Sequence, residues 1–342
     1  MAESEFSLPA AVFRKEGKFK PFSEDYKFLG KSKHSAVKPC YWTKKSLKNG
    51  GQCYKNRFYG IQSHQCVQMT PAQKFCNHSC VFCWRDIAQH SDSWEGGVDE
   101  PEEIVDGSIA GQLKLLTGFK GDAATSQIKY SLAQKPKHVA ISLDGEPALY
   151  PRLPELIKRF HSRGMSTFLV TNGTKPEAII RLREENALPT QLYVSLSAYD
   201  EGNYEKFIAP AGFNGWKKFL ETLDMLKEIP TRTVLRLTLT KTINFDFSDR
   251  YALLIKRAQA DYVEVKGYSA IGRSRKRLGL KFQPSHEEIK IFAGELQEHS
   301  GYCYSDEHVP SRIVLLSRDG TAHENRIIEF DGLVGGRDSR FS

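Results

Sequence analysis

No stretch of the 342-residue sequence is apolar enough to span a bilayer, so we expect no membrane partner. Low-complexity segments are also lacking, and 40% hydrophobic with 26% charged residues is a globular composition, which excludes collagen-like and disordered classes. The N-terminus begins Met-Ala-Glu-Ser-Glu-Phe and has no apolar run of the kind found in secretory signals. We therefore expect a cytoplasmic protein of one or two domains.

Acidic residues are absent from Tyr26 to Arg85, a window that holds eleven Lys and Arg. They are also absent from Val265 to His286, which holds six, whereas Asp92 to Asp106 is strongly acidic. Positive charge interleaved with aromatic side chains favours a polyanion partner, because cations bind phosphates and rings stack on bases. A solvated basic face fits the same pattern, and charge alone leaves both interpretations open.

The seven cysteines are unevenly placed. Six lie between Cys40 and Cys83, and Cys303 stands alone, so we expect a structural role for Cys303. An odd number and tight clustering in a reducing compartment indicate metal or redox chemistry rather than disulfide bridges.

After the cysteine segment, short β-rich runs alternate with amphipathic helical runs. The expected strands are 64–69, 138–143, 166–171, 191–196, 233–239, 261–266 and 312–317, and the expected helices are 151–164, 214–229, 248–258 and one after 285. Strand, helix and strand in series require crossover connections and hence a parallel sheet. The pattern predicts an α/β fold with a complete or partial (β/α) barrel.

In parallel barrels, active sites lie at the carboxyl ends of the strands. Polar residues follow the expected strands at these ends. They are Asp144, Glu146, Asn172, Ser195, Ser197 and Lys266, and the cysteine loop follows strand 64–69 in the same way. We therefore expect one face of the barrel to carry the chemistry.

Cys76, Cys80 and Cys83 form a CxxxCxxC pattern with Phe82 before the last cysteine. Three close thiolates can hold three irons of a 4Fe–4S cluster and leave the fourth iron open to a substrate. A structural zinc site is the alternative, but it needs a fourth ligand such as His78.

Cys40, Cys53 and Cys66 are separated by twelve residues each and could hold a second 4Fe–4S cluster. Three packed cysteines are the alternative. We expect residues 1–60 to form a basic extension that carries part of this second site, residues 61–320 to form the barrel, and residues 321–342 to form a C-terminal tail.

The CxxxCxxC loop resembles the signature of the radical S-adenosylmethionine (SAM) enzymes, in which SAM chelates the open iron and is cleaved to a 5'-deoxyadenosyl radical. Ser142 to Pro147 is similar to their Gly-Gly-Glu element, with Asp144 in place of the first glycine. The resemblance implies that Glu146 contacts the SAM amino group and that Asn172, Ser195 and Ser197 contact its ribose or carboxylate. Arg236 is a weaker candidate. Ordinary turn and loop roles remain open for each residue.

The evenly spaced cysteines, the CxxxCxxC loop and the Ser-Leu-x-Gly-Glu-Pro segment together resemble the archaeal-type tRNA 4-demethylwyosine synthases over most of the chain. The resemblance implies condensation of N1-methylguanosine at position 37 of tRNA(Phe) with pyruvate, and a second cluster that holds pyruvate. Longer members carry an FMN-binding domain. Fewer than forty residues precede Cys40, so we expect an external electron donor, and nothing requires more than a monomer.

Within this resemblance, Lys55 is our candidate for a Schiff base with pyruvate, its pKa depressed by cations such as Arg57, although it could instead bind phosphate. We expect Arg273, Arg275, Lys276 and Arg277 to grip the RNA backbone. Lys266 could also touch substrate.

Two other functions fit parts of the sequence. A two-cluster tRNA methylthiotransferase is disfavoured by the upstream cysteine spacing and by the lack of an evident RNA-binding β-barrel after Ser317. A metal-stabilised RNA-binding module without enzymatic activity would explain the cysteines and the charge. It would leave the Asp-Gly-Glu-Pro loop without a purpose.

Overall fold

The computed structural model describes residues 26–208, 214–333, 336, 338 and 340. Residues 1–25, part of the predicted N-terminal extension, and several residues of the predicted tail lie outside this range. Strands in the described part join one sheet in the order β1-β2-β3-β4-β5-β6-β7-β8-β10-β9. They are β1 (Lys27–Leu29), β2 (Ser35–Val37), β3 (Cys66–Thr70), β4 (His138–Ile141), β5 (Ser166–Thr171), β6 (Gln191–Ser195), β7 (Arg232–Leu239), β8 (Tyr262–Gly267), β9 (Cys303–His308) and β10 (Ile313–Ser317).

Strands β3 to β8 pair in parallel and in sequence order, while β1, β2, β9 and β10 are antiparallel additions at the two edges. The predicted (β/α) barrel is therefore confirmed in its partial form. The prediction that 312–317 extends the parallel sheet is wrong. Strand β10 returns from β9 and pairs antiparallel with β8, because a hairpin rather than a crossover helix connects it to β9.

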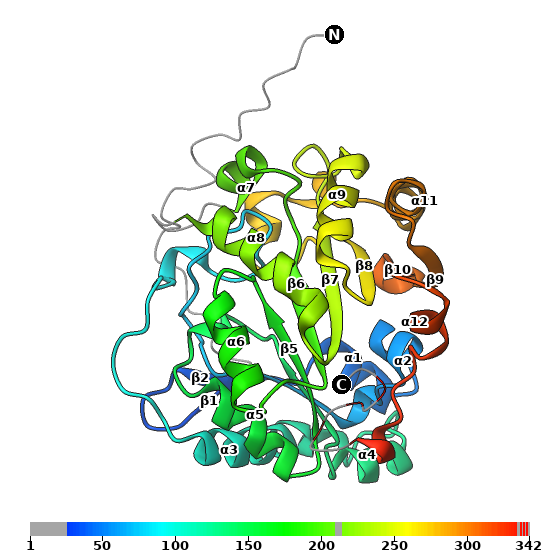
Figure 1. The fold of residues 1–342 in the computed structure, drawn as a ribbon. Helices are drawn as coiled ribbons and strands as arrows, with labels where there is room; N and C mark the ends of the chain where they lie inside the picture. Colours follow the sequence, from blue (N-terminus) through cyan, green and yellow to red (C-terminus); the bar gives the residue numbers. More distant parts are fainter. Residues whose placement is uncertain (1–25, 209–213, 334–335, 337, 339, 341–342) are drawn as a thin grey trace.

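The four predicted helices are present as α5, α8, α9 and α11, of which α9 has the predicted bounds while α5 and α8 are shorter than predicted (Figure 1). The helices are α1 (Tyr41–Leu47), α2 (Tyr54–Tyr59), α3 (Pro101–Leu116), α4 (Gln127–Ala133), α5 (Leu153–Ser162), α6 (Pro176–Glu184), α7 (Glu201–Phe207), α8 (Gly215–Met225), α9 (Ser248–Ala258), α10 (Ser274–Arg277), α11 (His286–Ser300) and α12 (Gly320–Glu324). In α5, Leu156, Ile157 and Phe160 are buried against the sheet, as their spacing predicts. Within the described residues, no helix has the length and hydropathy needed to cross a membrane.

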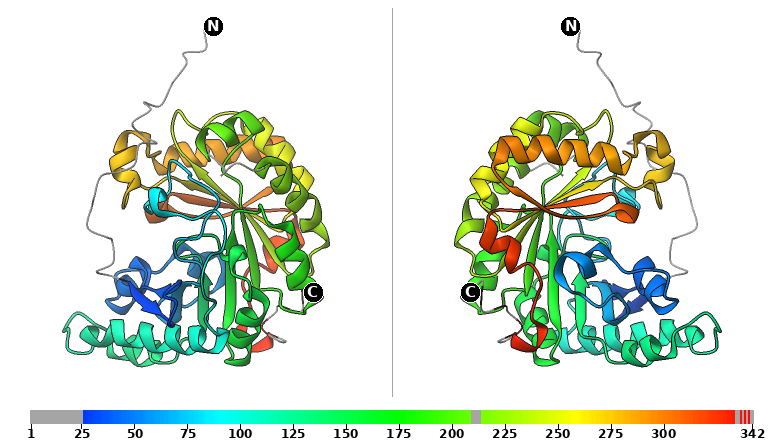
Figure 2. Two further views of the ribbon diagram at one scale, coloured as in Figure 1. Left: turned by 90° about the vertical axis from the view of Figure 1, so that its left-hand side faces the viewer. Right: turned by 90° about the vertical axis from the view of Figure 1, so that its right-hand side faces the viewer.

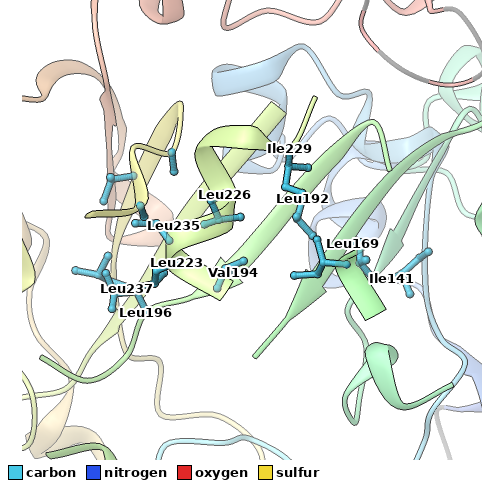
Figure 3. Packing of buried hydrophobic residues seen from close by; sticks show 14 of the residues in the cluster. Ile141, Leu169, Leu192, Val194, Leu196, Leu223, Leu226, Ile229, Leu235 and Leu237 are labelled. Atoms are coloured by element: carbon cyan, nitrogen blue, oxygen red, sulfur yellow. The ribbon is translucent and has the colours of Figure 1, made fainter. Parts of the chain in front are cut away.

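Alternate residues of the parallel strands point to opposite sides of the sheet, which creates two cores. On the outer side, aliphatic residues of the strands pack against the helices, as Figure 3 shows for Leu192, Val194 and Leu235 beside Leu223 and Leu226. On the inner side, the core is aromatic and includes residues of α2. It contains Tyr54, Phe58, Tyr59, Phe168, Tyr193, Val234 and Tyr262, with Cys53 and Cys66 packed against it.

The segment that carries α1 and α2 therefore fills the concave side of the sheet, opposite the outer helices (Figure 2). Part of the tail also packs on the barrel. Arg232, which is fully buried, donates hydrogen bonds to the carbonyl oxygens of Asn325 and Arg326 and pairs with Asp338. The predicted boundaries after residues 60 and 320 stay predictions.

The acidic segment from Asp92 to Asp106, for which the sequence suggests no role, binds the rest of the fold. The Asp99 carboxylate accepts hydrogen bonds from the backbone amides of Lys31 and Ser32, and the Asp99 amide lies 2.9 Å from His34 Nε2. Glu102, at the start of α3, forms ion pairs with Arg159 of α5 and with Arg163, the residue that follows α5. These contacts hold the acidic segment against the loop between β1 and β2, and they hold α3 against α5.

Candidate active site

A cavity of about 380 Å³ opens at the carboxyl ends of β4 to β8. Its wall contains the predicted residues Cys76, Cys80, Cys83, Glu146, Asn172, Ser195, Ser197, Arg236 and Lys266. On the strands, the cavity residues occupy inward positions, so that Ser195 is level with Arg236, and Thr238 with Lys266. The structure thus brings together residues that lie up to 190 positions apart in the chain.

The loop from Cys76 to Cys83 follows β3 and is held at both ends by backbone hydrogen bonds. Ser79 and Val81 donate to the carbonyl oxygens of Ile208 and Phe207, and Cys76 donates to that of Ser91. All three thiols are free. Burial raises the pKa of each thiol, to about 11 for Cys83, and the neighbouring thiols raise it further for Cys76 and Cys80.

Thiols whose pKa is raised by burial become thiolates when a cation compensates their charge, as bound iron does. A tetrahedral zinc site needs four ligands on one ion, whereas the three thiolates of a 4Fe–4S cluster bind different irons. His78, the fourth ligand of the zinc alternative, instead lies 2.6 Å from the Tyr204 hydroxyl through Nε2. The loop therefore fits a cluster.

Glu146 lies at the edge of the cavity and is 2% exposed. Its Oε1 accepts hydrogen bonds from the Thr171 hydroxyl and the Ala148 amide, and its Oε2 accepts one from the Asn172 amide at 2.6 Å. Burial raises the pKa of Glu146, and these hydrogen bonds oppose the rise. One lone pair of Oε2 is left by these bonds, so an ammonium group bound there would complete the set.

The turn before Glu146 explains the Asp-Gly-Glu sequence. Gly145 has φ +65°, and a Cβ atom there would collide with the carbonyl oxygens of Ala72 and Phe75, so only glycine fits. Asp144, which replaces a glycine of the family pattern, places Oδ1 3.7 Å from Arg85 Nε and 3.6 Å from His90 Nε2. The carboxylate that departs from the pattern is therefore placed beside the Arg85 guanidinium and the His90 ring.

The side chain of Asn172 is hydrogen-bonded within the protein, to Asn77 and Thr174. Its Nδ2 donates to Asn77 Oδ1 at 2.7 Å, and its Oδ1 accepts from the amide and hydroxyl of Thr174. These bonds connect the cysteine loop to the end of β5. The contacts of Asn172, Ser195 and Ser197 with SAM stay predictions.

Cys40, Cys53 and Cys66 come together on the concave side of the sheet, below the cavity. Cys40 precedes α1 and accepts a hydrogen bond from the Thr43 amide, Cys53 precedes α2, and Cys66 begins β3. Burial raises the pKa of Cys53 and of Cys66 to about 12, and the thiol of Cys40 contributes to both shifts. This second set therefore also consists of three thiols close enough to interact electrostatically, which a cluster could neutralise.

Lys55 lies in the aromatic inner core and is 8% exposed. Its Nζ is 4.4 Å from the centroid of the Tyr193 ring and 5.4 Å from that of Phe168. Burial lowers the pKa of Lys55, Glu264 opposes this, and Arg236 adds to it. The prediction that Arg57 depresses this pKa is wrong, because Arg57 points outward and pairs with Asp306 at 2.7 Å.

Sequence reasoning missed Glu264 and underrated Arg236 as neighbours of Lys55. Glu264 is 0% exposed, accepts a hydrogen bond from the Tyr59 hydroxyl at 3.0 Å, and lies 3.7 Å from Arg236 Nε. Both residues occupy inward positions of adjacent strands, at matching register. A charged residue inside an otherwise apolar strand is the signal that could have indicated them.

The four cations expected to grip RNA do not all face solvent. Arg273 is 3% exposed and its Nη2 lies 3.6 Å from Asp86, so its prediction as a phosphate contact is wrong. Arg277 donates to the carbonyl oxygens of Val81, Cys83 and Arg85 and thereby supports the cysteine loop. Arg275 and Lys276 are exposed, so for them RNA binding stays a prediction.

Two family models match the chain, the Radical SAM superfamily at residues 122–254 and Wyosine base formation at residues 257–318. The chain is 44% identical over 331 residues to the S-adenosyl-L-methionine-dependent tRNA 4-demethylwyosine synthase of Pyrococcus abyssi, which covers 94% of this chain and 93% of that protein. It is 39% identical over 311 residues to the synthase of the same name from Methanocaldococcus jannaschii, with 86% and 96% covered.

Solved structures agree with these matches. A structure of TYW1 with a lysine-pyruvate adduct bound has a TM-score of 0.76 at 38% identity, with 89% of this chain and 94% of that chain covered. A crystal structure of archaeal TYW1 has a TM-score of 0.70 at 35% identity, with 91% and 95% covered.

Proposed function

Since the chain belongs to the family of SAM-dependent tRNA 4-demethylwyosine synthases, which are radical SAM enzymes, we propose that it condenses N1-methylguanosine-37 of tRNA(Phe) with pyruvate. The product is 4-demethylwyosine, and the C1 carboxyl of pyruvate is lost. The observation that carries the proposal is that the wall of one cavity holds the CxxxCxxC loop and Glu146 as well as Arg236, the neighbour of Lys55.

The cofactor assignment follows from the two thiol sets. Radical SAM enzymes carry SAM and one 4Fe–4S cluster, and we assign that cluster to Cys76, Cys80 and Cys83. We assign a second 4Fe–4S cluster to Cys40, Cys53 and Cys66. When bound, the first cluster and SAM supply a 5'-deoxyadenosyl radical that removes a hydrogen atom from the N1-methyl group of the guanosine.

The residues of the chain orient the reactants around this step. Glu146 accepts a hydrogen bond from the SAM amino group, and Asn172, Ser195 and Ser197, which line the same cavity, contact its ribose or carboxylate. Lys55 binds pyruvate as a Schiff base, which requires a lysine that is held away from bulk water. A relative with a bound lysine-pyruvate adduct supports this role. The enzyme class is a carbon–carbon lyase or synthase.

The remaining partners are proposed from the same family. The chain acts as a cytoplasmic monomer and takes its electrons from an external donor. The experiment that tests the proposal supplies the anaerobically reconstituted protein with SAM, pyruvate, a strong reductant and tRNA carrying N1-methylguanosine. We expect mass spectrometry to detect the tricyclic nucleoside and 5'-deoxyadenosine together. If only 5'-deoxyadenosine forms, the assigned tRNA substrate is wrong. If neither product forms although both clusters are present and reducible, an RNA-binding module without enzymatic activity is favoured.

Exposed cations at the mouth of the cavity are expected to bind the tRNA backbone. Arg275 and Lys276 lie on α10, next to Ile271 of the cavity wall. In a plot of the logarithm of the binding constant against the logarithm of the salt concentration, each lost phosphate contact makes the slope shallower by about 0.7 to 0.9. The double variant Arg275→Glu/Lys276→Glu should therefore bind tRNA at least about tenfold more weakly at low salt, with a shallower slope, in a filter-binding titration.

The matched control reverses two cations on the outer helices, Arg183 of α6 and Lys256 of α9, which are equally exposed. We expect this control to retain the affinity for tRNA. Equal affinities for the two double variants would refute the assignment of α10 to RNA binding. SAM binding, measured in parallel, should be the same in both.

A further inference from the structure

Lys266 is a second amine in the cavity, and the proposed function gives it no task. It is near the end of β8, on the same side of the sheet as Glu264, and it lines the cavity. Its Nζ donates hydrogen bonds to the carbonyl oxygens of Gly267 at 3.3 Å and Ser311 at 3.2 Å. These two bonds hold the amine at the wall instead of letting the side chain extend into solvent.

The groups that face Lys266 come from each element packed around it. Arg236 from β7 and Arg312 from the turn before β10 are positive, while Glu264 from β8 and Cys53 from the start of α2 act in the opposite direction. Burial, followed by the two guanidinium groups, lowers the pKa of Lys266 to about 7. An ordinary lysine is almost fully protonated at neutral pH, whereas this one exists in both forms.

The proposed condensation contains a step that needs such a group. After the C1 carboxyl is lost, carbon 2 of pyruvate is bonded to the former methyl carbon and is held by Lys55 as an imine. The exocyclic N2 of guanine attacks this carbon, so that the N2–C bond forms and the bond between carbon and Lys55 Nζ breaks. N2 and the former methyl carbon each lose one proton, a C=C double bond of the new ring replaces the C=N bond of the imine, and the departing Lys55 amine gains two protons, without any change in oxidation state. An acid–base group near both nitrogens accelerates such an exchange.

We propose that Lys266 is the proton-transfer residue of ring closure, taking the proton from guanine N2 and returning one to the Lys55 amine. This inference rests on the proposed function. Other polar groups of the cavity suit the task less well. Arg236 does not lose its proton in proteins, Glu146 is engaged by Thr171, Asn172 and Ala148, and the Tyr268 hydroxyl donates to Ser274.

The test compares Lys266→Met and Lys266→Arg with the unaltered enzyme under the assay conditions given above. We expect both variants to form 5'-deoxyadenosine and to load pyruvate onto Lys55, as measured by borohydride trapping. Formation of the tricyclic nucleoside should fall by roughly 10²- to 10⁴-fold, the usual contribution of a positioned acid or base. Arginine retains the charge but cannot exchange a proton at neutral pH, so it should not rescue the rate.

A merely structural role would not produce the two further signals that we expect. Without ring closure, the uncyclised adduct stays on Lys55, so borohydride should link Lys266→Met covalently to its tRNA. The inflection near pH 7 in the rate of product formation by the unaltered enzyme should disappear in Lys266→Met. Lys256→Met on the outer helix α9 is the matched control and should behave like the unaltered enzyme.

Two results would overturn the inference. One is product formation by Lys266→Met at an undiminished rate with an unchanged pH profile. The other is loss of 5'-deoxyadenosine and of pyruvate loading together with the product, which would assign Lys266 to the architecture of the site. If the unaltered enzyme itself forms no tricyclic nucleoside, the proposed function fails and the role of Lys266 falls with it.

Discussion

Lys55→Ala is expected to abolish the tricyclic nucleoside while leaving the formation of 5'-deoxyadenosine intact. Lys55 lies in the inner core against Tyr193 and Phe168, whereas Glu146 and the CxxxCxxC loop line the cavity, so the SAM side keeps its contacts. Without the amine, pyruvate loses its covalent attachment. Loss of a covalent group typically costs a factor on the order of a thousand or more, which is measured as product per deoxyadenosine by mass spectrometry.

Two companion variants make this prediction sharper. Lys55→Arg keeps a positive charge but cannot form an imine with pyruvate, so it should fail in the same way as the alanine variant. Lys44→Ala removes an exposed lysine of α1 and should retain product formation. Product at the normal rate from Lys55→Ala would assign Lys55 to phosphate binding or packing instead.

Removing one cysteine from either set is expected to cost one cluster, but the two losses should have different effects on activity. We expect about eight irons in the reconstituted protein and about four in either Cys80→Ala or Cys53→Ala, because three thiolates are needed to retain each cluster. Cys80→Ala should form neither 5'-deoxyadenosine nor product. Cys53→Ala should still cleave SAM but form no tricyclic nucleoside. Iron analysis and mass spectrometry of the same samples check both statements.

Cys303→Ala is the control for this comparison, since Cys303 is exposed on β9 and belongs to neither set. Its iron content and activity should match those of the unaltered protein. A second cluster at Cys40, Cys53 and Cys66 would be refuted if Cys53→Ala kept its full iron content. Zinc at about one atom per chain, in place of iron, would refute both assignments.

The parallel strands and the outer helices could be predicted because their signals are local. Apolar residues at helical spacing in α5, and the β-branched and aromatic runs of β5 and β7, each specify an element without reference to the rest of the chain. Polar residues that follow such runs then indicate the functional edge of the sheet. Glu146, Asn172 and Ser197 line the cavity at this edge, and their functional roles stay predictions.

Direction and long-range pairing were beyond local reasoning. An apolar run such as Ile313–Ser317 reads the same whether the strand is parallel or antiparallel, and the polar strand β9 that reverses the chain has no apolar pattern. A cation likewise looks the same whether it binds RNA or a carbonyl oxygen. Arg277 reaches carbonyl groups more than 190 residues away, a contact that no sequence window contains.

The inward course of Arg277 has a consequence for how the enzyme meets its substrate. One short helix carries Arg275 and Lys276 toward solvent and anchors the CxxxCxxC loop through Arg277. If bound RNA favours one position of this helix, the hydrogen bonds of Arg277 favour the matching position of the loop. If tRNA binds at α10 as proposed, thermodynamic linkage makes the effect reciprocal: SAM would change the affinity for tRNA by the same factor by which tRNA would change the affinity for SAM. Arrival of the substrate and readiness of the cofactor would then be coupled through the Arg277 guanidinium and the hydrogen bond from the Arg273 amide to the Trp84 carbonyl oxygen.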